Sequence, residues 1–426
     1  MELLNIKYER NAVIMSIVRD MSLADHGRVK IDWVKKNMPL LNTIEKDFIK
    51  TQCLKGVKIT MCIHVEAKTA YLAEVLRSGG ADVALTGCNP LSTQDDVAAA
   101  LAKNGTNIYA WYNSTEEEYN NHLRKTLEFS PDIFLDDGGD ITNMLHSEFA
   151  DIPVWGGSEE TTTGIHRLKS REASGNLRVP VFSVNDAMCK HLFDNRYGTG
   201  QSVWNAINRT TNLITAGKNV VIAGYGWCGK GCAMRAKGLG ANVIICEVDP
   251  IKAMEAVMDG FAVMPMNEAA KTGDIFITVT GCERVIYDEH YKVMKDGAIL
   301  ANAGHFDVEI NIPELEAMSV EKKIVRDNIT GYKMPDGRWI NILAEGRLVN
   351  LASGDGHPAE IMDMSFAIQA LIMKYIAENH QKLESKVYDV PAEIDDYVAK
   401  LKLKTLGVEI DELTKEQAEY LSAYSN

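Results

Sequence analysis

The sequence predicts an α/β protein with two doubly wound parallel-sheet domains of the Rossmann type, followed by a helical C-terminal tail. Apolar runs of strand length alternate with helical stretches from about residue 57, which is typical of βαβ units. The same rhythm restarts after about residue 190. A chain of 426 residues is also long enough for two or three domains.

In the first domain the alternation covers residues 57–140. Strands are expected over 57–65, 81–88, 106–112 and 131–140, and helices over 68–80 and 93–105. Parallel sheets bind their ligands beyond the carboxyl ends of their strands. Ionisable side chains stand at two of these ends, and they are His64, Glu66, Asp136 and Asp137. The sequence therefore predicts a polar site at this edge of the first sheet.

The second domain is expected to cover residues 191–350. Its strand-like apolar runs lie within 218–231, 241–250, 260–265, 273–281 and 296–307. An amphipathic stretch over 362–379 is expected to form a helix that packs back on the first domain. The first domain would then comprise 1–190 and about 351–384. Residues 385–426 are charged and lack a core of their own, so they are expected to be a helical oligomerisation tail on a neighbouring subunit.

Composition and charge exclude several classes of partner. The formal net charge of −14 argues against nucleic acid and anionic membranes, which attract basic surfaces. No apolar run approaches the ~20 residues of a membrane span, and the N-terminus does not resemble a signal peptide. The eight cysteines form no CxxC or zinc-type spacing. We therefore expect no metal, reduced thiols and a cytoplasmic location.

A glycine-rich motif opens the second domain. Gly224, Gly226 and Gly229 fit the G-x-G-x-x-G pattern, after the strand-like "NVVIA" and before a helix. In this pattern the glycines allow a tight turn, close approach of a pyrophosphate, and helix–strand packing. Glu247 follows 23 residues after Gly224, where it would accept hydrogen bonds from the adenosine ribose. No arginine follows closely, so the motif favours NAD over NADP. The alternative is a glycine-rich turn without a ligand.

Two further stretches hold more polar residues than packing requires. "GSEETTTGIHRL" (157–168) has two carboxylates beside three threonines, and "VNDAMCKHLFDNRYG" (184–198) brings Asn185, Lys190, Asp194 and Asn195 together. Lys190 and Asp194 share one helix face at i, i+4. Taken alone, such a pair is more often a solvated surface ion pair contributing ~0.3–0.5 kcal/mol.

Taken together, these stretches resemble the S-adenosylhomocysteine hydrolase family. The matching segments are "STQDD" (92–96), "LDDGGD" (135–140), "SEETTTGIHRL" (158–168), "VND" (184–186), "KHLFDNRYG" (190–198), "GYGWCGKG" (224–231), "DIFITVTGC" (274–282), "GHFDVEI" (304–310), and "AEGRLVNL" with "GHP" (344–358). They run through most of the chain at compatible spacings.

The resemblance implies a redox-neutral reaction on a small-molecule thioether. Hydride passes from the ribose C3′ to bound NAD, and the resulting ketone acidifies the 4′ C–H. Loss of that proton expels homocysteine thiolate, water adds, and the hydride returns. The resemblance also implies a homotetramer.

The resemblance assigns roles residue by residue. Lys190 matches the base beside the 3′-hydroxyl, and desolvation would depress its pKa as that role requires. His64 with Asp137 would move protons at C5′. The remaining positions matched to the reacting centre or the substrate are Glu160, Asp194, Asn195, His305 and His357. The positions matched to the cofactor are Thr161, Thr162, Thr163, Asn195, Gly224, Gly226, Trp227, Cys228, Gly229, Lys230, Gly231, Glu247, Asn302, Ala303, Gly304, His305 and Asn350.

The chain departs from the family at Glu66 and Lys68. The family usually has Thr and Glu there, and that Glu accepts from the adenine amino group. Lys68 has only donors and ionised Glu66 only acceptors, which suits O6 and N1–H of hypoxanthine. We therefore expect S-inosyl-L-homocysteine as substrate, with Asp355 also altering base recognition. The alternative is that Glu66 and Lys68 pair with each other while backbone groups read adenine, as in S-adenosyl-L-homocysteine hydrolysis.

Other departures and rival functions remain open. Trp227 replaces a small acidic residue of the glycine loop, and the sequence stops before the Lys- and Tyr-bearing tail of the family's longer form. An ordinary NAD-dependent dehydrogenase would consume NAD stoichiometrically. A non-catalytic NAD-binding regulator would not need the ionisable set around His64 and Lys190.

Overall fold

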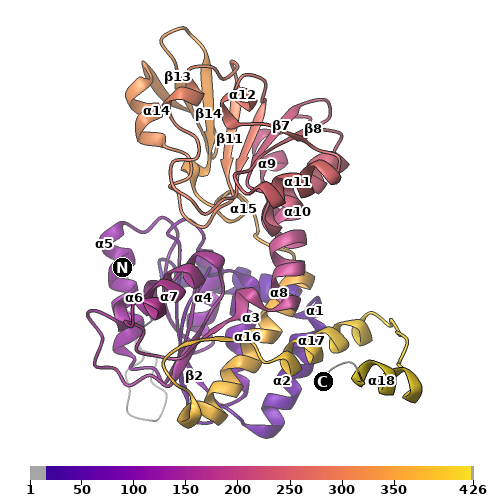
Figure 1. Cartoon of the computed structure of the whole chain (residues 1–426). Helices are drawn as coiled ribbons and strands as arrows, with labels where there is room; N and C mark the ends of the chain where they lie inside the picture. Colours follow the sequence, from indigo (N-terminus) through magenta and orange to yellow (C-terminus); the bar gives the residue numbers. More distant parts are fainter. Residues whose placement is uncertain (1–15, 424–426) are drawn as a thin grey trace.

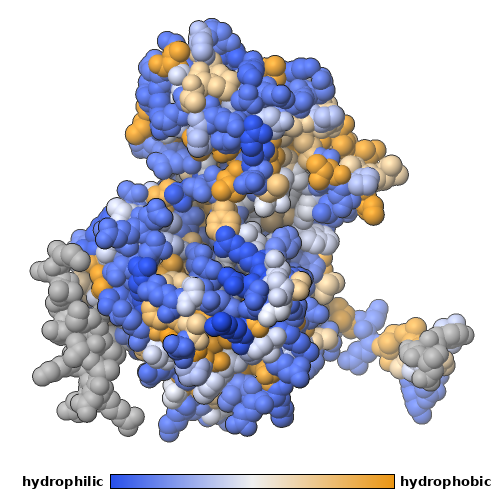
Figure 2. All heavy atoms as spheres, turned by 60° about the vertical axis from the view of Figure 1, so that its left-hand side comes forward, coloured by the Kyte–Doolittle hydropathy of each residue, from blue (hydrophilic) through white to orange (hydrophobic). Residues whose placement is uncertain are grey.

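A computed structural model describes residues 16–423 and shows two α/β domains, one above the other, joined by a narrow region (Figures 1 and 2). The predicted fold class is confirmed. Each domain has a mainly parallel sheet covered by helices, and every strand-like run of the sequence contributes a strand to one of these two sheets. No helix within this part of the chain has the length and apolar character needed to cross a membrane.

The first sheet has seven parallel strands in the order β15-β6-β5-β4-β1-β2-β3. The strands are β1 (Lys58–Cys62), β2 (Asp82–Thr86), β3 (Asn107–Tyr109), β4 (Ile133–Asp136), β5 (Gly156–Glu159), β6 (Val181–Ser183) and β15 (Val387–Asp389). Its main helices are α1 (Ala24–Lys36), α2 (Pro39–Thr51), α3 (Ala67–Ser78), α4 (Asp95–Lys103), α5 (Glu116–Glu128), α6 (Asp140–Leu145) and α7 (Thr162–Ala173).

The direction of chain progression reverses between β1 and β4. From β1 the chain moves outward to β2 and β3, whereas β4, β5 and β6 follow on the other side. Such a switch point leaves a crevice beyond the carboxyl ends of the two strands. His64 follows β1 and Asp137 follows β4, so the topology places both at this crevice.

The second sheet has eight strands in the order β12-β13-β14-β11-β10-β7-β8-β9. They are β7 (Asn219–Ala223), β8 (Asn242–Cys246), β9 (Ala262–Val263), β10 (Ile275–Thr278), β11 (Ala298–Asn302), β12 (Glu321–Arg326), β13 (Ile329–Lys333) and β14 (Trp339–Leu343). Its helices include α9 (Thr199–Thr211), α10 (Trp227–Gly238), α11 (Pro250–Met258), α14 (Ile312–Met318) and α15 (Val349–Ala352).

One edge of this sheet is antiparallel, which the sequence analysis did not predict. β13 runs antiparallel to both β12 and β14. Only two residues separate β12 from β13, and one of them, Asn328, has φ of 60°. Tight hairpins use such left-handed residues, and asparagine tolerates that conformation better than most side chains.

Helix α16 (Ala359–Asn379) returns the chain to the first domain. It packs against α2, α3 and β5, and Phe366, Ile368 and Ile372 belong to that domain's apolar core. Its residues 362–370 are buried on every side, because the helix lies between the sheet and the other helices. Two chain segments far apart in sequence therefore build one core (Figure 1).

The segment after α16 differs from the expected helical tail. Val387–Asp389 forms β15, which pairs with β6 of the same chain, and α17 (Ala392–Thr405) packs against α16 and α2 through the buried Val398. The three-residue strand exists because β6 offers it an edge, a cause that local sequence does not contain. Within the described part of this segment, α18 (Lys415–Ser422) is exposed along its whole length, and it stands off the body (Figure 2).

Candidate active site

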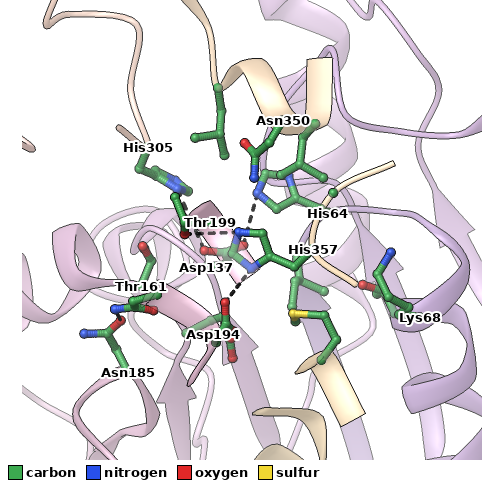
Figure 3. A pocket seen from close by; sticks show the side chains of 18 of the residues that line it. His64, Lys68, Asp137, Thr161, Asn185, Asp194, Thr199, His305, Asn350 and His357 are labelled. Atoms are coloured by element: carbon green, nitrogen blue, oxygen red, sulfur yellow. Dashed lines mark hydrogen bonds and ion pairs between the residues drawn. The ribbon is translucent and has the colours of Figure 1, made fainter. Parts of the chain in front are cut away.

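A cavity opens where the two domains meet (Figure 3). Its walls come from the carboxyl edge of the first sheet, from the link between the domains, and from residues 303–305 and 348–357. Of the predicted site residues, those that line it are His64, Glu66, Lys68, Asp137, Glu160, Thr161, Thr162, Lys190, Asp194, Asn195, Cys228, Ala303, His305, Asn350 and His357.

His64 and Asp137 face each other across the switch point. His64 Nε2 lies 3.4 Å from Asp137 Oδ2, and His64 Nδ1 lies 2.7 Å from the Ser92 hydroxyl. Burial lowers the pKa of His64 to about 4, outweighing the attraction of Asp137. The imidazole is therefore neutral near pH 7, with one proton to donate and one nitrogen to accept.

Cys88 completes this group, and the sequence analysis did not single it out. Its sulfur lies 3.3 Å from His64 Nδ1 and 3.3 Å from Asp137 Oδ2. Burial raises the pKa of the Cys88 thiol, so it stays protonated. Its place just after β2, beside β1, was the available signal. Within residues 16–423 this is the one group with ligand atoms close enough to hold a metal, so the expected absence of a metal stays a prediction.

Lys190 is held by two amides and two carboxylates. It lies at the end of α8 (Met188–Lys190), and its Nζ donates to Asn195 Oδ1 at 2.9 Å and to Asn185 Oδ1 at 3.4 Å. Glu160 Oε1 and Asp194 Oδ2 each lie 3.5 Å away. The expected depression of its pKa is wrong. Burial does act to lower the pKa of Lys190, but the carboxylates Asp194 and Glu160 outweigh it and raise the value.

The two carboxylates beside Lys190 differ in pKa. Burial raises the pKa of Glu160 to about 7. Burial also acts to raise the pKa of Asp194, but Lys190, His357 and the Ser365 hydroxyl outweigh it and lower the value. Asp194 is placed by a π-helical segment over 191–198, a rare form that occurs frequently at functional sites. His357 bridges Asp194 and the Thr199 hydroxyl (Figure 3).

Glu66 is the N-cap of α3. Its Oε1 accepts from Thr69 N at 3.2 Å and from the Thr69 hydroxyl at 3.4 Å, and its Oε2 accepts from Lys68 N at 3.0 Å. Lys68 Nζ also donates to Oε2, at 2.6 Å. The ion pair that the alternative assumed is therefore present. Ionised carboxylates have about four acceptor positions, so Glu66 has none left for a ligand.

Lys68 retains one donor toward the cavity. Besides its contact with Glu66, its ammonium donates to the backbone oxygen of Asp355 at 2.9 Å, which leaves one N–H of three. Asp355 does not line the cavity, and its side chain is exposed. The prediction that this side chain reads the base is wrong, because only its carbonyl reaches the site.

The glycine loop fits a bound pyrophosphate. Gly224 has φ of 102°, and a Cβ on Gly229 would lie 2.0 Å from the oxygen of Gly224. Gly226 is the N-cap of α10 and makes no side-chain cap, so the first amides of the helix are left for a ligand. A Cβ on Gly226 would meet no protein atom within 4 Å. The loop therefore has an open side directly at the helix N-terminus.

Three other predicted cofactor residues, Glu247, Asn350 and Asn302, differ in whether they offer a group to a ligand. Glu247 follows β8 and accepts from the backbone N–H of Tyr225 at 2.7 Å, beside the loop. Asn350 Oδ1 is buried and has no partner, so it offers an acceptor to a ligand in the cavity. The side-chain amide of Asn302 is instead fully hydrogen-bonded within the protein. Its Nδ2 donates to backbone oxygens, including that of Gly304, and its Oδ1 accepts from the Gly304 backbone N–H. Its side chain holds the loop rather than facing a ligand.

Five further predicted positions do not line the cavity; they are Thr163, Trp227, Lys230, Gly231 and Gly304. Lys230 Nζ lies 2.6 Å from Glu255 Oε1 and 4.4 Å from the centre of the Trp227 ring. A Cβ on Gly231 would lie 1.8 Å from the Arg196 oxygen, so this glycine lets α10 pack against the domain link. These contacts account for Lys230 and Gly231 without a ligand.

Two family models match the chain. The model described as S-adenosyl-L-homocysteine hydrolase matches residues 15–155, and the model of the NAD binding domain of the same enzyme matches residues 195–356. The second match covers the glycine loop, Glu247 and the cavity residues contributed by the second domain.

Curated relatives match nearly the full length. Adenosylhomocysteinase from Pyrococcus abyssi is 56% identical over 411 residues, covering 96% of this chain and 97% of that protein. S-inosyl-L-homocysteine hydrolase from Methanocaldococcus jannaschii is 58% identical over 406 residues, covering 95% of this chain and 98% of that protein. Adenosylhomocysteinase from Thermococcus kodakarensis is 57% identical over 411 residues, covering 96% of this chain and 98% of that protein.

The two kinds of relative do not differ enough in identity to choose between their named substrates. Both kinds of relative align with this chain over almost its entire length. The chain belongs to the S-adenosyl-L-homocysteine hydrolase family, and it is a hydrolase that uses NAD.

Proposed function

We propose that this chain hydrolyses S-inosyl-L-homocysteine reversibly to inosine and homocysteine. The observation that carries the choice of purine is the buried ammonium of Lys68, which lines the cavity with one N–H unused while Glu66 is saturated. A donor facing the purine 6-position matches the O6 acceptor of hypoxanthine. It opposes the amino donor that adenine carries at the same position.

The ribose would be held by the cluster around Lys190. Lys190 is protonated in the free protein, so it would first act as a donor to the 3′-oxygen rather than as a free base. Glu160 Oε1 is buried without a hydrogen-bond partner, which suits acceptance from a ribose hydroxyl. Bound NAD would supply hydride acceptance from C3′ and hydride return. The protein's part is to orient the sugar, hold these charges and exclude water.

Proton transfer at C5′ would fall to His64 and Asp137. The reaction needs a donor to the departing homocysteine sulfur and an acceptor from the incoming water. A neutral imidazole can accept the proton of the water that adds to C5′, and the Asp137 carboxylate 3.4 Å from its Nε2 stabilises the imidazolium that forms. That imidazolium can then protonate the homocysteine thiolate, which returns the imidazole to its neutral form. The Cys88 thiol, donating to Asp137, holds that carboxylate in place.

S-adenosyl-L-homocysteine hydrolysis is the second candidate, and the Glu66–Lys68 ion pair favours it. If the pair serves only to cap and brace α3, backbone groups would read adenine, and the spare N–H of Lys68 could donate to adenine N1. In that case the cavity would accept both purines with similar efficiency.

The synthetic direction tests the proposal without a prepared thioether. The holoenzyme is incubated with homocysteine and either inosine or adenosine, and product mass is read directly. We expect the inosyl thioether to form much faster than the adenosyl thioether. Equal or faster formation of the adenosyl product would overturn the purine assignment. Net accumulation of NADH with either nucleoside would instead indicate an ordinary dehydrogenase, and the absence of both product and NADH would indicate a binding protein.

A further inference from the structure

Helix α16 carries two fully buried, uncharged polar side chains, Ser365 and Gln369, four residues apart. This spacing places both on one face of the helix. Each contacts one carboxylate of the Lys190 cluster. The Ser365 hydroxyl donates to Asp194 Oδ2 at 2.7 Å, and Gln369 Nε2 donates to Glu160 Oε2 at 2.6 Å. A core helix therefore reaches the carboxylates from behind the cavity.

The orientation of the Gln369 amide is fixed by a third residue. Ser158, in the buried strand β5, donates its hydroxyl to Gln369 Oε1 at 2.6 Å. Because Oε1 takes this hydrogen bond, the NH2 group must face Glu160. An amide N–H stabilises a carboxylate that is ionised, and it has no acceptor to offer a protonated one.

Glu160 is the one carboxylate of this cluster that titrates near neutrality. The charged groups facing it are Lys190, Asp194 and Asp137, and burial opposes its ionised form. Its second oxygen, Oε1, lies 3.5 Å from Lys190 Nζ and has no hydrogen-bond partner. Gln369 is its sole uncharged side-chain donor in the part of the chain that the structure describes.

We propose that Gln369, oriented by Ser158, is a positioning residue that keeps Glu160 ionised and turned toward Lys190. Ser158, Gln369 and Glu160 then form a chain of two orienting hydrogen bonds, called the relay below, which runs from the sheet to the ribose-binding end of the cavity. This proposal adds to the proposed function an explanation of how Glu160 is kept ionised. It rests on the proposed function only for the role of Glu160 in binding the ribose.

Substituting Gln369→Met tests the relay, because methionine fills similar space and has no N–H. The acid limb of the pH profile of kcat/KM should move upward by about one to two pH units, the range expected for losing a hydrogen bond to a charged group. Ser158→Ala frees the amide to rotate and should give a smaller shift in the same direction. Met373→Leu, one turn further along the buried face of α16, is the matched control and should leave the profile unchanged.

A second readout separates this inference from the proposed function. With glutamate labelled at the side-chain carboxyl carbon, the Glu160 resonance is assigned by its loss in Glu160→Gln, and its titration is followed in wild type and Gln369→Met. An upward shift in the variant supports the relay even if neither thioether is turned over. Identical Glu160 titration in both proteins, with wild-type turnover intact, would overturn the relay and leave the proposed function standing.

Discussion

Lys68 Nζ lies 2.6 Å from Glu66 Oε2, and both side chains are buried at the edge of the cavity. The Glu66 carboxylate is also the N-cap of α3, so one member of the ion pair stabilises the helix while the other, Lys68, lines the cavity. In the function proposed above, this relationship leaves the ammonium of Lys68 as the group that discriminates between purines.

Substituting Lys68→Met should therefore reverse the preference for the purine. Removing the donor leaves hypoxanthine O6 unpaired in a buried site, so kcat/KM for S-inosyl-L-homocysteine should fall about 10–100-fold. The value for the adenosyl thioether should stay level or rise. Lys68→Gln, which retains an N–H donor, is the matched control and should lose less. Equal losses for both thioethers would show that Lys68 supports the helix rather than the choice of base.

His64 should make the folded state sensitive to acid. Its pKa is about 4 in the folded protein and ~6.5 in an unfolded chain, so the unfolded state binds the proton first as pH falls. This contribution to stability is complete above pH 6.5 and is lost toward pH 4. Between pH 7 and 4.5, His64→Asn should lose about 2–3 kcal/mol less unfolding free energy than wild type.

Urea denaturation at the two pH values measures this difference. His166→Asn is the control, since His166 is an exposed residue on α7 outside the cavity. If His64→Asn and His166→Asn lose the same stability on acidification, the neutral state assigned to His64 is wrong.

Two alanine substitutions should separate cofactor binding from folding. Gly226→Ala places its Cβ in open space at the helix N-terminus, so the melting temperature should change little while NAD affinity falls at least ~10-fold, the cost of blocking close approach of the pyrophosphate. Gly229→Ala would put a Cβ 2.0 Å from the Gly224 oxygen and should lower the melting temperature of the second domain itself. Calorimetric titration of NAD and thermal melts check both. Unchanged NAD affinity in Gly226→Ala would contradict the placement of the pyrophosphate.

Removing residues 407–426 should change assembly and leave the fold intact. This segment buries no side chain within the described chain, and Ile410 and Leu413 are exposed at 65% and 62%. We propose that residues 407–426 contact a neighbouring subunit. This segment is shorter than the expected tail of 385–426, because β15 and α17 pack on the same chain. Light scattering should show a smaller oligomer, with an unchanged melting temperature for the dissociated chain at low concentration. An unchanged oligomer would rule out this role.

The fold and the glycine loop could be predicted because their signals are local. Strand-length apolar runs alternate with helices, and the spacing of Gly224, Gly226 and Gly229 depends on one turn and one helix start. The local pattern over 362–379 also predicts a helix, although residues 362–370 of α16 are buried on every side. Tertiary pairing, by contrast, decides the strand β15, whose three residues are ordered by the edge of β6.

The charges in the site could not be predicted in the same way. Burial alone suggested a depressed pKa for Lys190, but the value is raised because Glu160 and Asp194 converge on it. Ser158 and Gln369 are 211 residues apart, and no spacing rule connects them. The sequence could predict which residue types gather at the sheet edge, whereas the number of carboxylates around one ammonium depends on the folded chain.

Competition between the two thioethers tests the central claim most directly. S-inosyl-L-homocysteine and S-adenosyl-L-homocysteine are mixed at equal concentration with the holoenzyme, and the initial ratio of inosine to adenosine is measured by mass, which equals the ratio of their kcat/KM values. The donor at Lys68 predicts a ratio well above ten in favour of inosine. A ratio of one or less would contradict the assignment of this site to hypoxanthine.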